Sequence, residues 1–230
     1  MSEITTCTVD ARISTIGDLD RFLKSKVSAK RYVHSQGVAA TMVRLLEMYP
    51  SNDYQKTWNG MDAAFFCGLS HDIARELDDD SILAYCHENS VELTHQEIDA
   101  PVLAHGKVSA DIVSKLCPGY PSSWKRAIEV HTTGCAGMDS LALALFVADF
   151  IEPSRRFMTD ERRSYYLASP NLGSCAYRVL CDMMDHWKES GFLCIANGSV
   201  GMKADLESKG CNEGRFPWLD RETSKGGCRC

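Results

Sequence analysis

Apolar residues recur at intervals of three and four along most of the chain, which is the spacing of one face of an α-helix. No segment shows the strict alternation of apolar and polar residues that is typical of a half-buried strand. The predicted helices are one that begins at Ile16 and others over about 28–48, 61–76, 81–86, 101–116, 121–131, 141–151, 160–167 and 172–188. The pattern therefore predicts an all-α fold, a bundle of helices around one core.

The pattern also divides the chain. Residues 1–15 have no clear periodicity and form an expected N-terminal extension. Residues 16–198 carry the helices and form one expected domain. From residue 199 to 230 the composition shifts to Gly, Lys, Glu, Arg and Asp, which predicts a tail that is poorly ordered or packed only locally.

Composition narrows the class of protein. A chain of 230 residues with 44% hydrophobic and 24% charged residues is typical of an ordinary globular protein. The net charge of −6 argues against a nucleic-acid binder, whose phosphate contacts demand a basic face. It leaves room for a small anionic substrate, because a bound metal ion supplies local positive charge.

The apolar runs and the cysteines indicate the cellular compartment. No apolar run reaches the roughly 18–20 residues that span a bilayer, and Met1 to Asp10 lack the apolar segment of a signal peptide. The eleven cysteines form no C-x-x-C pair, so a zinc ribbon is not expected, and free thiols in a reducing compartment are the simplest account. We therefore expect a cytoplasmic protein that contacts no membrane.

The residues of chemical interest are histidines and aspartates, and all of them except His105 lie at the polar ends or on the apolar faces of predicted helices. His71 and Asp72 end an apolar run, which alone indicates no more than a solvated helix end. Asp149 is the only carboxylate in the apolar run 141–151 and needs a metal or a cation beside it, because burying an unpaired carboxylate costs several kcal/mol. The full candidate set is His34, His71, Asp72, His105, His131 and Asp149.

These residues can meet at the centre of a bundle, where metal sites are built from side chains on facing helices. Imidazoles combined with carboxylates suit Fe, Mn, Co or Zn better than Mg²⁺, which prefers oxygen ligands. The sequence predicts one or two ions.

The order H…HD…H…H…D is that of the HD-domain metal-dependent phosphohydrolases. The segments around it closely resemble the YqeK family, bacterial HD-domain hydrolases that cut diadenosine tetraphosphate symmetrically into two ADP. The resemblance covers roughly residues 17–195 and is carried by Arg31-x-x-His34-Ser35, Gly68 to Ala74 (GLSHDIA), Leu103 to Gly106 (LAHG), His131 to Gly134 (HTTG) and Ala148 to Arg155 (ADFIEPSR). The HTTG and ADFIEPSR segments are its most specific parts.

The resemblance implies a set of roles. His34, His71, Asp72 and Asp149 would hold the first metal, for which the family points to iron. The other residues that would bind the nucleotide or a second ion are His105, Gly106, His131, Thr132, Arg75 and Arg155. His105 and His131 would complete a second metal site or bind phosphate directly.

The implied mechanism is metal-assisted hydrolysis, in which hydroxide attacks an inner phosphate and ADP leaves. The residues expected to act in catalysis are Asp72, His71 and Arg155. Asp72 would orient the attacking water, while Arg155 and Arg75 would neutralise charge on the phosphate oxygens. Thr132 and the backbone at Gly106 would donate to phosphate oxygens.

Two alternatives stay open. The first is an HD phosphohydrolase that acts on a nucleoside monophosphate, a guanosine polyphosphate or a cyclic dinucleotide. The second is a nucleotide-binding sensor without turnover, against which the intact ligand set argues. A homodimer is compatible with a protein of this size.

Overall fold

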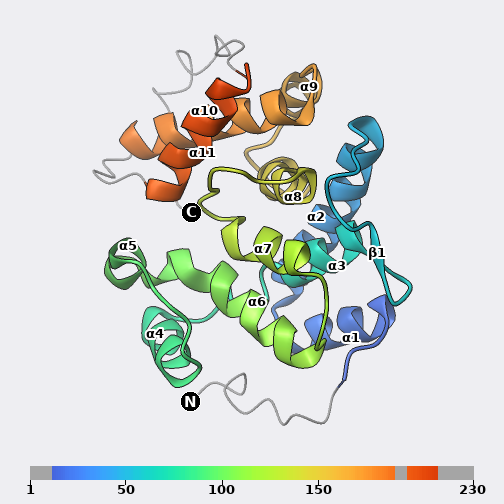
Figure 1. Cartoon of the computed structure of the whole chain (residues 1–230), viewed down its shortest axis with the longest axis vertical. Helices are drawn as coiled ribbons and strands as arrows, with labels where there is room; N and C mark the ends of the chain where they lie inside the picture. The colour runs from blue at the N-terminus through green and yellow to red at the C-terminus, as the bar shows by residue number, and fades with distance from the viewer. Residues whose placement is uncertain (1–11, 190–195, 212–230) are drawn as a thin grey trace.

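The structure, a computed structural model, describes residues 12–189 and 196–211, and within them it is helical apart from one short hairpin (Figure 1). The elements are α1 (Ile16–Lys26), α2 (Ala29–Met48), β1 (Thr57–Trp58), β2 (Met61–Asp62), α3 (Ala63–Ser70), α4 (Asp79–Glu88), α5 (His95–Asp99), the 3₁₀ helix η1 (Pro101–Ala104), α6 (His105–Leu116), α7 (Ser122–Val130), α8 (Ser140–Ile151), α9 (Asp160–Leu167), α10 (Leu172–Glu189) and α11 (Asn197–Ser208). This architecture confirms the predicted all-α class.

Most helices begin at a residue whose side chain accepts a hydrogen bond from the first turn. Ser28 caps α2 and Asp139 caps α8. Thr15 and Asp18 form a reciprocal capping box at α1. Such caps satisfy backbone N–H groups that have no partner within the helix, and each stabilises a helix by about 1 kcal/mol.

Helix α8 is the centre of the bundle. It is apolar along most of its length, and it packs on α2, α7 and α10, which surround it where it is seen nearly end-on in Figure 1. A helix that is apolar on all sides needs such a buried position. This position carries Asp149, near the end of α8, to the level of α2 and α3.

Helices α2 and α3 pack most extensively on each other, and Gly68 allows their close approach. A Cβ atom at residue 68 would lie 2.4 Å from the Cα atom of Ala39 and 2.7 Å from its backbone nitrogen. These neighbours are backbone atoms, so they cannot move aside as a side chain can. The glycine therefore sets the distance between the two helices that carry the first histidines of the candidate set.

The helix expected over 61–76 is wrong at both ends. Met61 and Asp62 form β2, which pairs with β1, and the helix ends at Ser70. Beyond it the backbone makes i→i+3 hydrogen bonds, such as Arg75 N to Asp72 O at 3.1 Å. The apolar spacing continues through this turn, but Ser109 Oγ accepts the hydrogen bond of Ala74 N at 3.1 Å, a tertiary contact that periodicity does not show.

Two more helices differ from the sequence prediction. Residues 95–99 form α5, which begins with a Thr94–Glu97 capping box in a segment with little apolar pattern. Helix α11 crosses the expected boundary at residue 199, and its Met202 and Leu206 are buried, so residues 199–208 belong to the packed structure. The rest of the expected tail, 212–230, and most of the extension, 1–11, lie outside the described residues.

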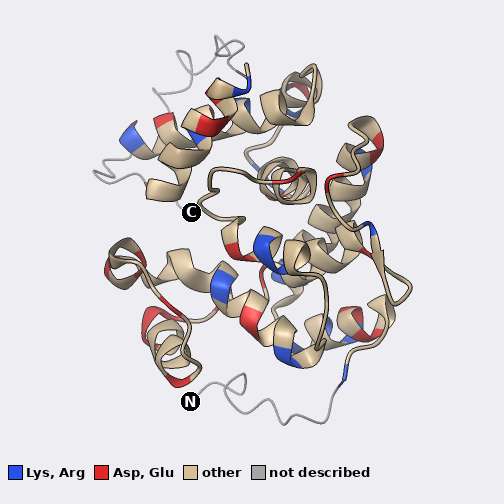
Figure 2. Ribbon diagram, viewed as in Figure 1, with Lys and Arg blue, Asp and Glu red and all other residues tan. Residues whose placement is uncertain are grey.

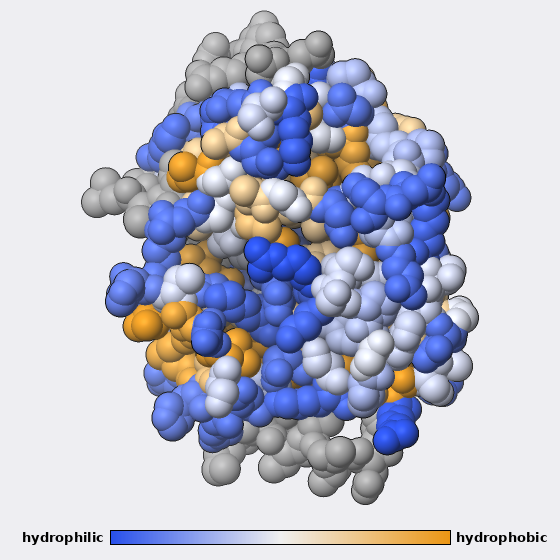
Figure 3. All heavy atoms as spheres, in the orientation of Figure 1, coloured by the Kyte–Doolittle hydropathy of each residue, from blue (hydrophilic) through white to orange (hydrophobic). Residues whose placement is uncertain are grey.

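Charged residues of both signs are interspersed over the helices in Figure 2, without a wholly basic face in this view. The face drawn in Figure 3 is mainly hydrophilic, with apolar atoms gathered at its lower left. Among the described residues, none of the helices combines the length and the apolar character that crossing a bilayer requires.

The cysteines that the structure describes are free thiols, as expected. Most are buried and pack as small apolar side chains, while Cys135 and Cys181 are half-buried.

We predict that Gly68→Ala lowers stability, because its Cβ would force α2 and α3 apart. Overpacking of this kind costs typically about 1–3 kcal/mol, and about 2–4 °C of melting temperature corresponds to each kcal/mol at this chain length. The matched control is Gly201→Ala in α11, where the added Cβ would meet nothing closer than 3.8 Å. The control should hold or raise the melting temperature, and a Gly68→Ala protein as stable as the control would contradict the close-approach argument.

Candidate metal centre

The six candidate residues come together in the interior although they derive from five different helices or helix ends. His34 lies on α2, Asp149 on α8 and His105 at the start of α6. The other three follow helix ends: His71 and Asp72 after α3, and His131 after α7. The histidines and Asp72 are buried, and the Asp149 side chain is 24% exposed, so it forms the open side of the site.

Asp72 lies between two groups of donors. One of its oxygens, Oδ2, is 3.5 Å from His34 Nε2 and 3.4 Å from His71 Nε2, and Asp149 Oδ1 is 3.0 Å from His34 Nε2. The other oxygen, Oδ1, is 3.1 Å from His105 Nε2 and 3.5 Å from His131 Nε2. Within each group all donor atoms lie within 4.8 Å of one another.

Every histidine of the two groups is anchored through its Nδ1 atom. The partners are Glu152 Oε1 for His34 (2.9 Å) and the carbonyl oxygens of Gly68 for His71 (2.8 Å), Val102 for His105 (2.6 Å) and Ile128 for His131 (2.8 Å). These oxygens accept hydrogen bonds and do not donate, so Nδ1 carries the proton and Nε2 of the neutral ring carries a lone pair.

The Nε2 atoms are the evidence that the residues fit a cation, because each needs a proton or a metal ion against it. His34 Nε2 and His71 Nε2 are buried without a hydrogen-bond donor. His105 Nε2 and His131 Nε2 lie 3.0 Å apart, where two lone pairs repel unless a proton or a metal ion lies against them. Nitrogen and carboxylate donors of this kind suit a divalent transition metal, and carbonyl or carboxylate partners on the far nitrogen are typical of metal-binding histidines.

In the absence of a metal, the proton on His34 offsets part of the repulsion between the neighbouring carboxylates. Burial opposes the charge on His34, but Asp149, Asp72 and Glu152 outweigh it and raise its pKa from 6.5 to about 10. Burial also opposes ionisation of Asp72 and Asp149, but the neighbouring histidines and Arg155 hold the pKa of both carboxyls well below its usual range. Burial lowers the pKa of His131, which keeps this imidazole neutral.

Two arginines complete the charge balance at the open side. Arg31 forms an ion pair with Asp72, and Arg155 forms one with Asp149 through a guanidinium nitrogen while its Nε donates to the Asp149 carbonyl at 2.8 Å. With Glu152 the site has three carboxylates against two guanidiniums. With the protonated His34 the net charge of these groups is zero. A divalent cation that displaces this proton would change it to plus one, which favours an anionic substrate.

Glu152 and Arg31 belong to the motifs in the sequence, but sequence reasoning gave neither of them a role. Glu152 is fully buried, and Gly37 makes room for it, since a Cβ there would lie 2.5 Å from Glu152 Oε2. Arg31 precedes His34 by three residues and so shares its helix face. The i, i+3 spacing from His34 in α2 could have indicated that Arg31 lies at the site. The position of Glu152 directly after the apolar helix α8 was a weaker indication that it lies there too.

Gly106 and Thr132 lie beside the second group. A Cβ at residue 106 would be 2.8 Å from the Ile128 carbonyl oxygen and 3.0 Å from His131 Nδ1, so the glycine lets α6 approach α7 and brings His105 to His131. Thr132 Oγ1 is 3.3 Å from both His105 Nε2 and His131 Nε2. Its hydroxyl therefore faces the same space as the two lone pairs.

Arg75 is not brought into the cluster. Its side chain is half-buried and makes no ion pair or hydrogen bond with another described residue, while its backbone N–H donates to Asp72 O. The remaining described histidines, His87, His95 and His186, lie on α4, α5 and α10 outside the two groups.

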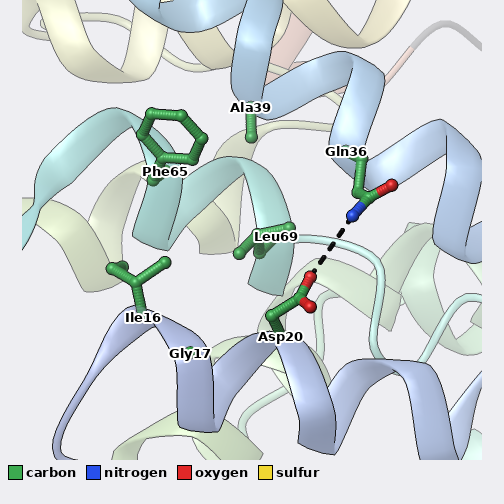
Figure 4. Close-up of a pocket in the computed structure, with 7 residues that line it drawn as sticks. All are labelled: Ile16, Gly17, Asp20, Gln36, Ala39, Phe65 and Leu69. Carbon is green, nitrogen blue, oxygen red and sulfur yellow. Dashed lines mark hydrogen bonds between the residues drawn. The ribbon is translucent and has the colours of Figure 1, made fainter.

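A pocket of about 350 Å³ lies elsewhere, between α1, α2 and α3 (Figure 4). Its lining residues are Ile16, Gly17, Asp20, Gln36, Ala39, Phe65 and Leu69. None of them belongs to either donor group, and its polar contact is a hydrogen bond from Gln36 to Asp20 at 3.4 Å. The chemistry of the chain is therefore not located in this pocket.

Comparison with known proteins finds similarity to curated bacterial enzymes. The chain is 27% identical over 135 residues to the symmetrical bis(5'-nucleosyl)-tetraphosphatase of Bacillus subtilis, covering 59% of this chain and 68% of the relative. It is 30% identical over 139 residues to the enzyme of the same name from Halalkalibacterium halodurans, covering 60% and 68%. The enzyme of Staphylococcus aureus is 32% identical over 136 residues, covering 59% and 65%.

The fold is similar to that of a solved structure, described as a "predicted HD superfamily hydrolase involved in NAD metabolism" from Clostridium acetobutylicum. The TM-score is 0.73 at 25% identity, over 84% of this chain and 97% of the other. A scan against protein-family models gives no match.

We predict that metal binding releases a proton from His34. Because its pKa is raised from 6.5 to about 10, His34 is protonated at pH 7.5 in the metal-free protein, and an ion that binds Nε2 must displace that proton. Calorimetric titration with a divalent metal at pH 7.5, in buffers of different ionisation enthalpy, counts the protons released. His34→Gln should lower the count by about one, whereas His87→Gln on α4 should leave it unchanged. A binding enthalpy that does not depend on the buffer would contradict this assignment.

We further predict that Glu152→Gln weakens metal binding while the protein stays folded. The amide cannot supply the negative charge that orients His34 and raises its basicity, and changes of this kind cost about 10–100-fold in affinity. Competition against a chelator measures the effect. Glu129→Gln, at a partly exposed ion pair with Lys125 on α7, is the control. Equal affinities in the two variants would show that Glu152 does not act on the metal.

Proposed function

The chain belongs to the family of symmetrical bis(5'-nucleosyl)-tetraphosphatases, which are HD-domain hydrolases, and we propose that it hydrolyses diadenosine tetraphosphate symmetrically to two ADP. That it is a phosphohydrolase follows from the family. The observation that supports the proposed chemistry most directly is the convergence of four anchored Nε2 atoms on Asp72 and Asp149.

In this proposal His34, His71, Asp72 and Asp149 hold the first metal ion. His105 and His131 hold a second ion with Asp72 or bind a phosphate oxygen directly. A bound transition metal supplies Lewis acidity, which makes water a nucleophile near neutral pH. Iron is the metal we propose, with manganese, cobalt and zinc as alternatives that metal analysis of the purified protein separates.

Asp72 has the task of orientation. Its pKa is held well below its usual range, so at neutral pH it accepts hydrogen bonds without taking the proton. An oxygen of this carboxylate can therefore hold an attacking water molecule in line with the phosphorus atom. His71, whose Nδ1 is fixed on the Gly68 carbonyl, keeps its Nε2 beside the same carboxylate.

The two arginines at the open side of the site, Arg31 and Arg155, would bind the phosphate chain of the substrate. Arg155 and Arg31 are partly exposed, and each would exchange part of its ion pair for a phosphate oxygen when substrate binds. Thr132 donates its hydroxyl, and the N-terminus of α6 at Gly106 adds backbone N–H groups. Arg75 would have to turn toward the site to take the role expected of it. The cytoplasmic location and the homodimer stay predictions.

The alternatives are separated by the products. Diadenosine tetraphosphate should give ADP alone, and a mixture of ATP and AMP would contradict symmetrical cleavage. Inorganic phosphate from a nucleoside monophosphate, or turnover of a guanosine polyphosphate or a cyclic dinucleotide without turnover of diadenosine tetraphosphate, would favour another HD phosphohydrolase. Binding without any turnover in the metal-loaded protein would favour a sensor.

We predict that Asp72→Asn lowers kcat for diadenosine tetraphosphate by at least about a hundredfold, the low end of what a positioned group contributes. Asp111→Asn on α6, where the carboxylate bonds Tyr85 and Lys115, is the control and should keep wild-type rates. Metal content is measured for both proteins. Undiminished hydrolysis by Asp72→Asn would refute the mechanism.

A further inference from the structure

One face of α11 covers the loop that follows His131. Gly198, Met202 and Asp205 are spaced by four and three residues, so they share one side of the helix. All three contact the loop: Gly198 and Met202 lie against Gly134, and Asp205 accepts a hydrogen bond from Gly137 N at 3.1 Å. The helix is therefore fitted to the loop along much of its length.

Ser199 contacts the residue that directly follows Thr132. It is fully buried, and its Oγ donates to the carbonyl oxygen of Thr133 at 2.7 Å. This bond fixes the backbone directly after Thr132, whose hydroxyl is 3.3 Å from His105 Nε2 and from His131 Nε2. Only Thr133 therefore separates Ser199 from Thr132, whose hydroxyl faces the two histidines.

Two glycines show how closely helix and loop are matched. A Cβ at residue 198 would lie 2.3 Å from the Gly134 carbonyl oxygen, and a Cβ at residue 134 would lie 2.3 Å from Met202 Sδ. Gly134 also has a φ of 66°, in the left-handed region that favours glycine. The nearly fully buried Met202 packs against the loop at Gly134.

We propose that α11 is a positioning element for hydrolysis, in which Ser199, by holding the Thr133 carbonyl, keeps the Thr132 hydroxyl directed at the space between His105 and His131. Ser199 itself contacts no reacting atom in this account. The inference rests on the proposed function, because it gives Thr132 the task of donating to a phosphate oxygen.

The test is a double-mutant cycle between Ser199 and Thr132. Ser199→Ala should lower kcat for diadenosine tetraphosphate roughly three- to tenfold, which corresponds to one neutral hydrogen bond. In a Thr132→Val background, which lacks the hydroxyl, the same change should have almost no further effect, because the two residues act as a unit. A general loss of folded protein would instead multiply both rates by the same factor, and that result would overturn the proposal.

Ser208→Ala is the matched control, because its hydroxyl bonds only the Asp205 carbonyl of its own helix in the described structure. It should leave kcat unchanged. Gly198→Ala keeps the Ser199 hydroxyl but pushes on Gly134, so it should lower kcat in the same direction as Ser199→Ala. Wild-type kcat in both Ser199→Ala and Gly198→Ala would also overturn the proposal.

Amide hydrogen exchange gives a reading that does not depend on the substrate. Exchange over 131–138 should be faster in Ser199→Ala than in wild type, while exchange in α6 and α8 stays the same. If the wild-type protein cleaves no diadenosine tetraphosphate, the proposed function fails, and faster exchange of this loop alone still supports the positioning role. Unchanged exchange over 131–138 refutes that role whatever the substrate is.

Discussion

The arrangement of the centre depends on the contacts that the Asp72 carboxylate makes. Its two oxygens face different histidine pairs, and Arg31 lies against one of them. Placing Asp72, Asp149 and Glu152 together in a largely buried region is costly unless cations or protons offset their repulsion. The arginines, a protonated His34 or a bound metal supply that compensation. The surrounding helices hold groups that would repel one another without it.

Close backbone packing makes this arrangement possible. Gly68 lets α2 meet α3, Gly106 lets α6 meet α7, and Gly37 leaves room for the Glu152 carboxylate. At each position a methyl group would collide with backbone or with a residue of the centre. The glycines therefore set the distances between the donor atoms by allowing the helices to pack closely, although glycine has no side chain that could bind a metal.

The helical spacing was sufficient to predict most helices, and five of the six converging residues end a predicted helix or lie on its apolar face. His105 joined them only through the motif order H…HD…H…H…D. The spacing failed where tertiary contacts decide the backbone. Ser109 ends the regular helix before Ala74, and the burial of Met202 makes α11 part of the packed structure. The anchoring role of Glu152 and the ion pair of Arg31 were equally out of reach, because both depend on partners far along the chain.

The hydrogen bond between His34 and Glu152 joins residues 118 positions apart. A nascent chain from which only α2 and α3 have emerged has His34, His71 and Asp72 but neither Asp149 nor the anchor of the first imidazole. The four donors of the first group therefore come together only after α8 has been synthesised and has packed on α2 and α7.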